Sequence, residues 1–489
     1  MTKKEKEEKI GKKKITFKID KEKNFSKWFS EIVAKAELAD LRYNVKGFVV
    51  FAPWSVLVME KMYDAFEQEL QKQMHLPCYF PSLIPEENFK KEAKHVSGFK
   101  PEVFWVTQAG NKKIEKLALR PTSETAFFQL YSLWIRSYKD LPFKRYQRAN
   151  IFRYETKTTH PFMRSREFYW LEAHDCFASK EDAEKQVQED IAITEKIMHQ
   201  KFGIPSIPFR RPEWDKFAGA IYTIGSDVLM PDGKLTQQPS THLLDQGFAK
   251  VFNIRFKDEK GEKQFVWQTC YGPCISRIFA SLIALHGDNS GLIYPFFLAP
   301  IQVIIIPIFT AKNKPTVLKK VKEVEKKLTK DDISSMIDDR EIAVGEKFYY
   351  WEMKGVPLRL EIGEKELKGK LTLFLRDEKK RKRVSLAQIK KEGLALDRRL
   401  RKKADSAFEK AIVNVKNFDE LKTALKNKKI ARCNFCSIDK KGERCAAVVE
   451  KELLASVRGV RADKKEKAKG KCIFCSKKAG CVVYIAKSY

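Results

Sequence analysis

The chain has 489 residues, which is too long for one ordinary hydrophobic core, so we expect about three domains. Hydrophobic residues make up 43% of the sequence and aromatic residues 12%, a globular composition that excludes a disordered chain. Lysine and arginine number 96 against 64 acidic residues, a net charge of +32, which favours a polyanionic partner such as nucleic acid. A generally lysine-rich proteome would give the same balance.

The N-terminal segment, residues 1–24, carries ten lysines and five acidic residues, and it predicts a frayed basic tail without a secretory signal. The longest uncharged run, residues 290–311, is long enough for a membrane helix, but three prolines interrupt it. We therefore expect a linker and a buried strand there, and no membrane segment. A large lysine-rich chain of this kind is expected in the cytoplasm, where thiols stay reduced.

Residues 25–299 are rich in aromatic residues and mix two kinds of pattern. Helical periodicity predicts helices at 28–38 and 55–74, whereas residues 46–53 and 166–177 predict strands. Helices and strands do not alternate regularly. This region therefore predicts an α+β domain built on an antiparallel sheet with flanking helices, and not a doubly wound sheet.

A densely charged hairpin is predicted within this region. The segments 150–155 (NIFRYE) and 166–174 (REFYWLEAH) would pair as antiparallel strands. Side-chain alternation would place five residues of the second strand on one face, namely Arg166, Phe168, Trp170, Glu172 and His174. Arginine forks bind phosphates, an aromatic face stacks on a purine, and a carboxylate holds an ammonium group. The hairpin therefore suits an elongated ligand, although a salt-bridged surface hairpin would carry the same charges.

The region after residue 300 follows a strand–helix–strand order. The predicted elements are an amphipathic helix at 314–330 and strands at 301–308, 333–339, 356–363 and 370–377. This order predicts a small α/β domain with a mainly parallel sheet over residues 300–399. The basic run at 378–403 would be either a solvated helix face or a surface that faces RNA.

The last region, residues 400–489, is a cysteine-rich module. Six of the ten cysteines lie between residues 433 and 481, and two CxxC pairs stand at 433–436 and 472–475. In a reducing compartment such pairs indicate a tetrahedral metal site, with zinc as the expected ion, and not disulfides.

Three motifs in chain order resemble those of the class II aminoacyl-tRNA synthetases. Residues 152–155 (FRYE), followed by Arg164 and Phe168, resemble motif 2, and residues 271–289, which include Arg277, resemble motif 3. Residues 46–53 (KGFVVFAP) resemble the motif 1 strand that ends in proline, here Pro53. Further segments resemble the archaeal and eukaryotic-type branch of the prolyl-tRNA synthetases, at 117–124, 166–174, 216–220, 286–292 and 345–363. The resemblance covers nearly everything after about residue 25.

This resemblance implies a reaction and a set of residues. The enzyme would activate L-proline with ATP and Mg²⁺ and transfer the prolyl group to tRNA(Pro). Its catalytic residues would be Arg153, Arg164 and Arg277. The nucleotide would contact Arg153, Glu155, Arg164, Phe168, Gln237, Ser240 and Arg277. Proline would contact Thr122, Glu124, Arg153, Trp170, Glu172, His174, Phe217 and His242, where His174 and His242 could equally serve as hydrogen-bonded structural residues.

The resemblance also implies the roles of the other domains. Residues 300–399 would bind the anticodon, with candidates Arg340, Lys347, Arg359, Glu361, Arg376 and Asp377, for each of which an ordinary ion pair is the simpler interpretation. Residues 400–489 would hold a structural Zn²⁺ on Cys436, Cys445, Cys472 and Cys475, with Cys433 as the alternative to Cys445. Motif 1 would form the interface of a homodimer.

Several departures and alternatives stay open at this stage. Ile275 precedes Arg277 where the family usually offers a threonine hydroxyl, and the interval between His174 and Cys270 is too short for an editing insertion. A class IIa synthetase for threonine or glycine would keep the ATP motifs and change the amino-acid pocket. A catalytically inactive RNA-binding paralogue would be expected to lack Arg153 or Arg277. A zinc-ribbon nucleic-acid-binding protein would leave residues 117–292 unexplained.

Overall fold

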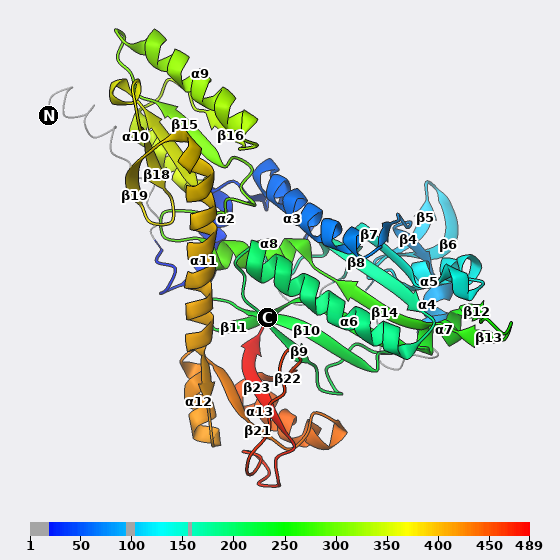
Figure 1. Cartoon of the computed structure of the whole chain (residues 1–489). Coiled ribbons are helices and arrows are strands. Elements are labelled where there is room, and N and C mark those ends of the chain that lie inside the picture. The colour runs from blue at the N-terminus through cyan, green and yellow to red at the C-terminus, as the bar shows by residue number, and fades with distance from the viewer. Residues whose placement is uncertain (1–18, 94–102, 155–158) are drawn as a thin grey trace.

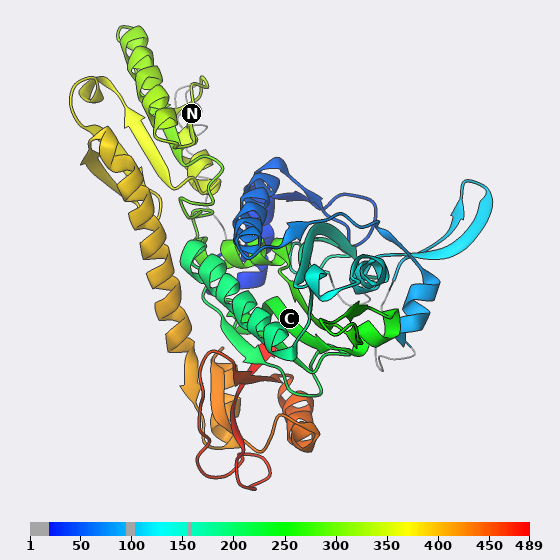
Figure 2. The same ribbon diagram turned by 45° about the vertical axis from the view of Figure 1, so that its right-hand side comes forward.

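The computed structural model describes residues 19–93, 103–154 and 159–489. A central body carries a small α/β domain above it and a second small domain below it in the view of Figure 1. The long helix α11 (Ile389–Ala411) runs along one side of the central body and connects the two small domains (Figures 1 and 2). The predicted boundary at residues 399/400 falls inside this helix.

The central body is built on an antiparallel sheet, as predicted. Its strands lie in the order β9-β10-β11-β14-β8-β7, and the short β3 joins β7 in parallel. Their bounds are β3 (Leu76–Pro77), β7 (Phe143–Phe152), β8 (Glu167–Phe177), β9 (Ile207–Arg210), β10 (Tyr222–Leu229), β11 (Lys234–Asp245) and β14 (Trp267–Gly272).

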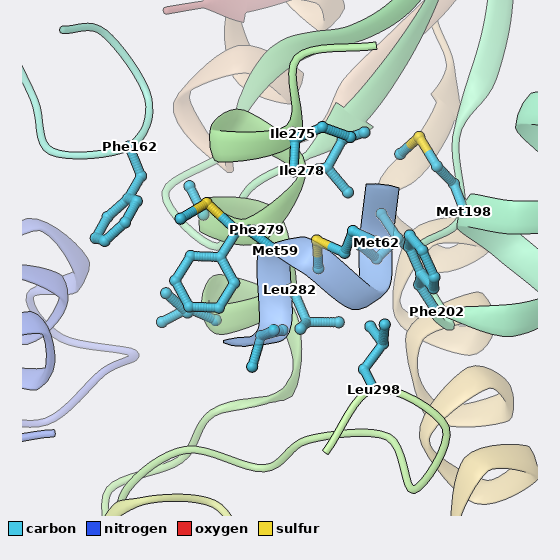
Figure 3. Close-up of a cluster of buried hydrophobic side chains, with 14 of the residues drawn as sticks. Met59, Met62, Phe162, Met198, Phe202, Ile275, Ile278, Phe279, Leu282 and Leu298 are labelled. Carbon is cyan, nitrogen blue, oxygen red and sulfur yellow. The ribbon is translucent and has the colours of Figure 1, made fainter. Parts of the chain in front are cut away.

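Helices cover both faces of this sheet. One face packs against α3 (Pro53–Lys72), α6 (Lys180–Thr194) and α8 (Ile275–His286), and the buried side chains between them include Met59, Met62, Ile278, Phe279 and Leu282 (Figure 3). The other face carries α5 (Glu124–Trp134) and α7 (Gly247–Phe252). On β8, Leu171 and Ala173 pack on the face covered by α3, α6 and α8, while Cys176 packs on the face covered by α5 and α7. This follows from the alternation of side chains along a strand.

Shorter elements complete the central body. They are α2 (Phe25–Lys35), β1 (Ala39–Asp40), β2 (Val50–Phe51), β4 (Leu83–Pro85), α4 (Glu86–Ala93), β5 (Trp105–Ala109), β6 (Lys112–Leu119), η1 (Tyr138–Asp140), η2 (Glu195–Lys201), β12 (Arg255–Lys257) and β13 (Lys263–Phe265). The predicted strand at 46–53 is wrong except at Val50–Phe51. Pro53 does not end a strand, because it is the first residue of α3, where its fixed φ suits a helix start.

The upper domain holds a five-stranded sheet in the order β16-β15-β17-β18-β19. Strand β15 is parallel to both neighbours, but β18 is antiparallel to β17 and β19, so the prediction of a mainly parallel sheet is only half right. The elements are β15 (Val303–Pro307), α9 (Lys314–Lys330), β16 (Ser335–Ile337), α10 (Val344–Met353), β17 (Leu358–Ile362), η3 (Glu364–Glu366), β18 (Leu371–Leu375), β19 (Lys380–Val384) and η4 (Leu386–Gln388).

Several anticodon candidates in this domain are buried in ion pairs. Arg359 contacts Glu352 and Glu361, and the fully buried Arg376 donates to Asp288 of the central body at 2.6 Å. For Arg359 and Arg376 the ion-pair interpretation is therefore the one that the structure supports.

No helix in the described part of the chain is long and apolar enough to cross a bilayer. Residues 290–311 contain the buried strand β15, as predicted.

The lower domain extends the central sheet, a feature that was not predicted. Its strands continue in the order β20-β21-β23-β22, and β22 pairs with β9 to give one sheet of 11 strands. Strand β23 also pairs in parallel with β11, and the C-terminus therefore lies against the central body (Figures 1 and 2). The elements are β20 (Ile412–Asn414), α12 (Phe418–Lys426), β21 (Ile430–Phe435), η5 (Lys440–Gly442), α13 (Glu443–Leu453), β22 (Ser456–Arg461) and β23 (Cys481–Ser488).

Candidate active site

The predicted hairpin is present, and its strands are antiparallel. Strand β7 pairs with β8 from Phe143↔Cys176 to Phe152↔Glu167, and the backbone N–H of Arg153 donates to the carbonyl of Arg166 at 2.9 Å. Arg166 itself departs from the prediction. It precedes β8, donates to the carbonyl of Lys46 and stacks on Tyr154 at 4.4 Å, and it does not line the cavity described next.

A cavity of about 250 Å³ opens on the α5 side of the sheet. It brings together all eight residues expected to contact proline, which are Thr122, Glu124, Arg153, Trp170, Glu172, His174, Phe217 and His242. Four residues of the expected nucleotide set line it, namely Arg153, which belongs to both sets, and Gln237, Ser240 and Arg277. Glu155 lies outside the described residues. The lining is completed by residues that no sequence motif marked, namely Asp215, Lys216, Thr223, Gln238, Cys270, Tyr271 and Gly272.

The cavity floor is a row of side chains across four strands. His174 is the cross-strand partner of Cys270, Cys270 of His242, and His242 of Thr223, so all four share one face. Both ring nitrogens of His242 are engaged, Nδ1 with the Thr223 hydroxyl at 2.8 Å and Nε2 with the Ser240 hydroxyl at 3.0 Å. Enclosure of the ring lowers the pKa of His242 to about 3, so this residue is a neutral part of the wall.

Glu172 and His174 form a buried pair on β8. His174 Nε2 lies 3.2 Å from Glu172 Oε2, and the Gln147 amide donates to Glu172 Oε1 at 2.8 Å. Burial alone would raise the pKa of the Glu172 carboxyl, but His174, Ser123 and Gln147 lower it. Burial likewise opposes protonation of His174, but Glu172 and Glu124 raise its pKa above the usual value. Each group thus favours the charged form of the other.

Glu124 on α5 and Trp170 on β8 complete the walls of the cavity. Glu124 is buried in the first turn of α5, and the Thr122 hydroxyl donates to it. Trp170 packs directly over Gly272, where an added Cβ would lie 2.4 Å from the indole ring. Only glycine at this position lets the ring lie flat against β14, and this contact limits the size of the cavity.

Arginines converge at the other end of the cavity. Arg153 Nε donates to the carbonyl of Pro121 at 3.1 Å, and its guanidinium lies 5.4 Å from the centre of the Phe168 ring. Arg277 stands in the first turn of α8 and donates to the carbonyls of Gln237 at 2.9 Å and Met163 at 3.3 Å. The backbone of two separate segments thus fixes its direction.

A second, polar cavity of about 590 Å³ adjoins the first and shares Asp215, Gln237 and Arg277 with it. Its remaining lining includes Arg164, as expected for a phosphate contact, and Lys234, Arg458 and Tyr489. Phe168 lines neither cavity; it is buried against Ala149 and Ile151. Together the two cavities have the elongated shape and the positive outer end that the hairpin predicted.

A buried ionic network supports the junction of the two cavities. Asp227 accepts from Arg211 at 2.6 Å and from Arg458 at 2.7 Å, and Arg211 also donates to the Gln237 side chain at 3.0 Å. Arg458 belongs to β22 of the lower domain. Sequence reasoning missed this network, because its members lie far apart in the chain and form no local motif.

The lower domain assembles a cysteine cluster. The sulfurs of Cys436, Cys445, Cys472 and Cys475 all lie within 4.8 Å of one another, and those of Cys436 and Cys445 are 3.7 Å apart. A tetrahedral ZnS₄ centre with bonds of about 2.3 Å has sulfurs about 3.8 Å apart, so this donor set fits zinc. The alternative ligand, Cys433, is buried on β21 outside the cluster.

Family models match three successive parts of the chain. The tRNA synthetase class II core domain (G, H, P, S and T) matches residues 104–286, and the anticodon binding domain matches residues 302–395. The prolyl-tRNA synthetase C-terminal domain matches residues 418–489. The chain is also similar to the proline–tRNA ligase of Thermofilum pendens, with 46% identity over 480 residues that cover 96% of this chain and 98% of the relative.

Two solved structures are similar over nearly the whole chain. One is the prolyl-tRNA synthetase of Giardia lamblia in complex with prolyl-adenylate, with a TM-score of 0.93, 37% identity, and coverage of 97% of this chain and 100% of that one. The other is the prolyl-tRNA synthetase of Cryptosporidium parvum with L-proline and AMP, with a TM-score of 0.89, 31% identity, and coverage of 97% of each chain.

Proposed function

The chain belongs to the prolyl-tRNA synthetase family, and from that premise we propose how its own residues perform the reaction. L-Proline and ATP react in the paired cavities to give prolyl-adenylate and pyrophosphate, and the prolyl group then passes to the 3′ end of tRNA(Pro). The observation that carries this proposal is the meeting of a buried carboxylate, a small aromatic-walled cavity and converging arginines in one place. The relatives solved with prolyl-adenylate and with L-proline and AMP support it.

Proline occupies the smaller cavity in this proposal. Glu124, assisted by Thr122, accepts hydrogen bonds from the secondary ammonium group, and the ring lies between Trp170, Phe217 and His242. Glu172 and His174 form the charged floor. The carboxylate of proline points to Arg153. Selection of proline over other amino acids rests on the shape of the cavity. This selection is limited for ligands of similar size, because one methylene group changes the free energy of binding by only about 1–3 kcal/mol.

ATP spans the junction of the two cavities. Arg153 contacts the α-phosphate and Arg164 the outer phosphates, while Gln237 and Ser240 contact the nucleotide. Arg277 covers one face of the adenine. The expected stacking of Phe168 on the other face stays a prediction, because Phe168 lines neither cavity, and the expected contact of Glu155 with the amino group lies outside the described residues. Mg²⁺ enters with ATP as the counter-ion of its phosphates.

The chemistry needs no protein nucleophile. A carboxylate oxygen of proline attacks the α-phosphorus in line, and the bond to pyrophosphate breaks. Arg153, Arg164 and Arg277 hold the reacting groups in line and neutralise the charge that develops on the phosphate oxygens. In the second step, a terminal ribose hydroxyl of tRNA attacks the carbonyl of prolyl-adenylate and AMP leaves.

The other domains have roles in tRNA binding and assembly. The proposed units are a basic tail (1–24), a catalytic domain (25–299), an anticodon-binding domain (300–399) and a zinc domain (400–489), where α11 (Ile389–Ala411) belongs to both of the last two. Zn²⁺ on Cys436, Cys445, Cys472 and Cys475 is structural, because four thiolates leave no open position. The four exposed basic residues of β19 (Lys380–Val384) are suited to a tRNA backbone, although three of them also pair with nearby glutamates.

A homodimer is supported by an apolar surface. Exposed large hydrophobic side chains concentrate between residues 41 and 83, where they are Leu41, Tyr43, Val45, Val50, Leu57, Met74, Leu76, Tyr79 and Leu83. We propose that this segment, which follows α2 and includes α3, forms the interface, because large exposed apolar side chains on a folded protein are typical of interaction surfaces. We also place the enzyme in the cytoplasm, where its ten free cysteines stay reduced.

The test is exchange of labelled pyrophosphate into ATP, run with each of the twenty amino acids. Exchange with proline alone is expected. Exchange with another amino acid would keep the fold and overturn the assignment of the smaller cavity, and no exchange from folded, zinc-loaded protein would overturn the proposed activation step.

A further inference from the structure

We propose that a thiophilic divalent cation of the Zn²⁺ class binds Glu124, His174 and Cys270 at the base of the smaller cavity, and that this cation and proline exclude each other. The site is separate from the four-cysteine cluster of the lower domain. The mutual exclusion rests on the proposed function, whereas the metal site itself rests only on the residues described below.

Three elements bring the three ligands together. Cys270 on β14 and His174 on β8 are direct cross-strand partners with side chains on the same face, and Glu124 approaches them from the first turn of α5. One ligand atom from each residue lies within 4.8 Å of the other two, and all three side chains are buried. Among the described residues only the four-cysteine cluster forms another such group.

The hydrogen bonds of His174 supply an independent observation. Nε2 of its ring is paired with Glu172, while Nδ1 is buried and has no hydrogen-bond partner among the described residues. A metal-binding histidine characteristically uses one nitrogen for the metal and binds a carboxylate with the other, which orients the ring. Glu172 already occupies that supporting position, and Gln147 holds Glu172 in turn.

The donor set selects the kind of cation. One sulfur, one nitrogen and one oxygen suit Zn²⁺, Cd²⁺ or Co²⁺ better than Mg²⁺ or Ca²⁺, which prefer oxygen donors. Three protein ligands leave a fourth position that opens into the cavity, as in catalytic zinc sites. When the metal binds, the thiol proton of Cys270 and the proton on Nδ1 of a charged His174 ring both leave to solvent, while Nε2 keeps its proton toward Glu172.

Occupancy by the cation and by proline cannot coincide. The carboxylate of Glu124 would serve either the ammonium group of proline or the metal, and two positive charges at one carboxylate repel each other. Both also need the space beside Glu124 at the base of the same cavity of about 250 Å³. A cation of this class is therefore a competitive inhibitor with respect to proline.

The experiment uses the full-length protein with its structural zinc loaded and without ATP, which would chelate the metal. Addition of Co²⁺ is expected to give one further bound equivalent with a thiolate-to-cobalt absorption band. Cys270→Ser should remove the band and weaken Co²⁺ binding by about 10–100-fold or more. Cys274→Ser is the matched control, because Cys274 is also buried yet lines neither cavity, and it should keep the band.

Calorimetric titration with proline completes the test on the unmodified protein. The apparent dissociation constant of proline should rise in proportion to the Co²⁺ concentration. A band that survives in Cys270→Ser, or no band at all, overturns the metal site. A band that depends on Cys270 but persists at saturating proline overturns the mutual exclusion. Failure of proline to bind in the absence of metal would instead count against the proposed function.

Discussion

Replacement of Asp227 by alanine should be among the most destabilising single changes in the catalytic domain. The Asp227 carboxylate is fully buried and accepts four hydrogen bonds, two from Arg211 at 2.6 and 3.0 Å and two from Arg458 at 2.7 and 3.2 Å. Without it, two guanidinium groups remain buried without their shared counter-charge. Removal of one partner from a buried pair costs about 3–5 kcal/mol. We expect the free energy of unfolding to fall by about 3 kcal/mol, near the lower end of this range. The reason is that Arg458 borders the polar cavity, where water can hydrate its guanidinium group.

The pH dependence follows from the same geometry. Burial alone would raise the pKa of Asp227, but Arg211 and Arg458 lower it to about 2. A carboxyl whose pKa is depressed in the folded state stabilises above its unfolded pKa of about 4, and this stabilisation is lost as the pH falls toward 2. The difference between Asp227→Ala and the unmodified protein should therefore be constant from about pH 5 to 8 and shrink below about pH 4.

Urea unfolding followed by tryptophan fluorescence measures this difference. Asp463→Ala is the matched control, since Asp463 also pairs with an arginine of β22, Arg461, but is exposed, and the loss of unfolding free energy should stay below about 1 kcal/mol. Asp227→Ala should also raise the KM for ATP, because Arg211 would no longer be held against Gln237. Equal losses in the two variants would refute the reasoning.

Further substitutions test other parts of the site. Arg277→Ala should lower proline-dependent pyrophosphate exchange by about 10²–10³-fold or more while tRNA binding persists, and normal exchange would contradict its role. Gly272→Ala should raise the KM for proline by displacing Trp170, whereas Gly345→Ala, which meets no atom within 4 Å, should leave it unchanged. Removal of zinc by a strong chelator, or Cys472→Ser, should lower the thermal midpoint of the lower domain, and an unchanged midpoint in metal-free protein would exclude a structural zinc. Hydrogen bonds to Glu195 and Asp405 raise the pKa of His199, so its stabilisation is full below about pH 6.5 and is lost as the pH rises through the folded pKa. His199→Gln should therefore destabilise the protein at about pH 6 and much less at about pH 9 in thermal melts.

Local periodicity was enough to predict the hairpin face that lines the cavity. Trp170, Glu172 and His174 alternate along β8, and a period of two leaves no other arrangement once the strand is assigned. The same rule failed for Arg166, because the strand begins one residue later and the chain before it turns toward Lys46. It also failed for residues 46–53, since a short apolar run before a proline fits either the end of a strand or the approach to a helix, and only tertiary packing decides between them.

The link between the lower domain and the polar cavity could not be predicted, because strand pairing between distant segments leaves no local pattern. Strand β22 joins β9 through Val460↔Arg210, and only this pairing brings Arg458 to Asp227.

Strand β23 forms a second link. The cysteine cluster lies near one end of this strand, and its other end continues into Ser488 and Tyr489, which line the polar cavity. Tyr489 donates to Asp232 at 2.9 Å and so fixes the end of the chain there. A zinc ion that orders the loop before β23 therefore also orders one wall of the cavity in which ATP is expected, and its loss should weaken ATP binding before it weakens proline binding.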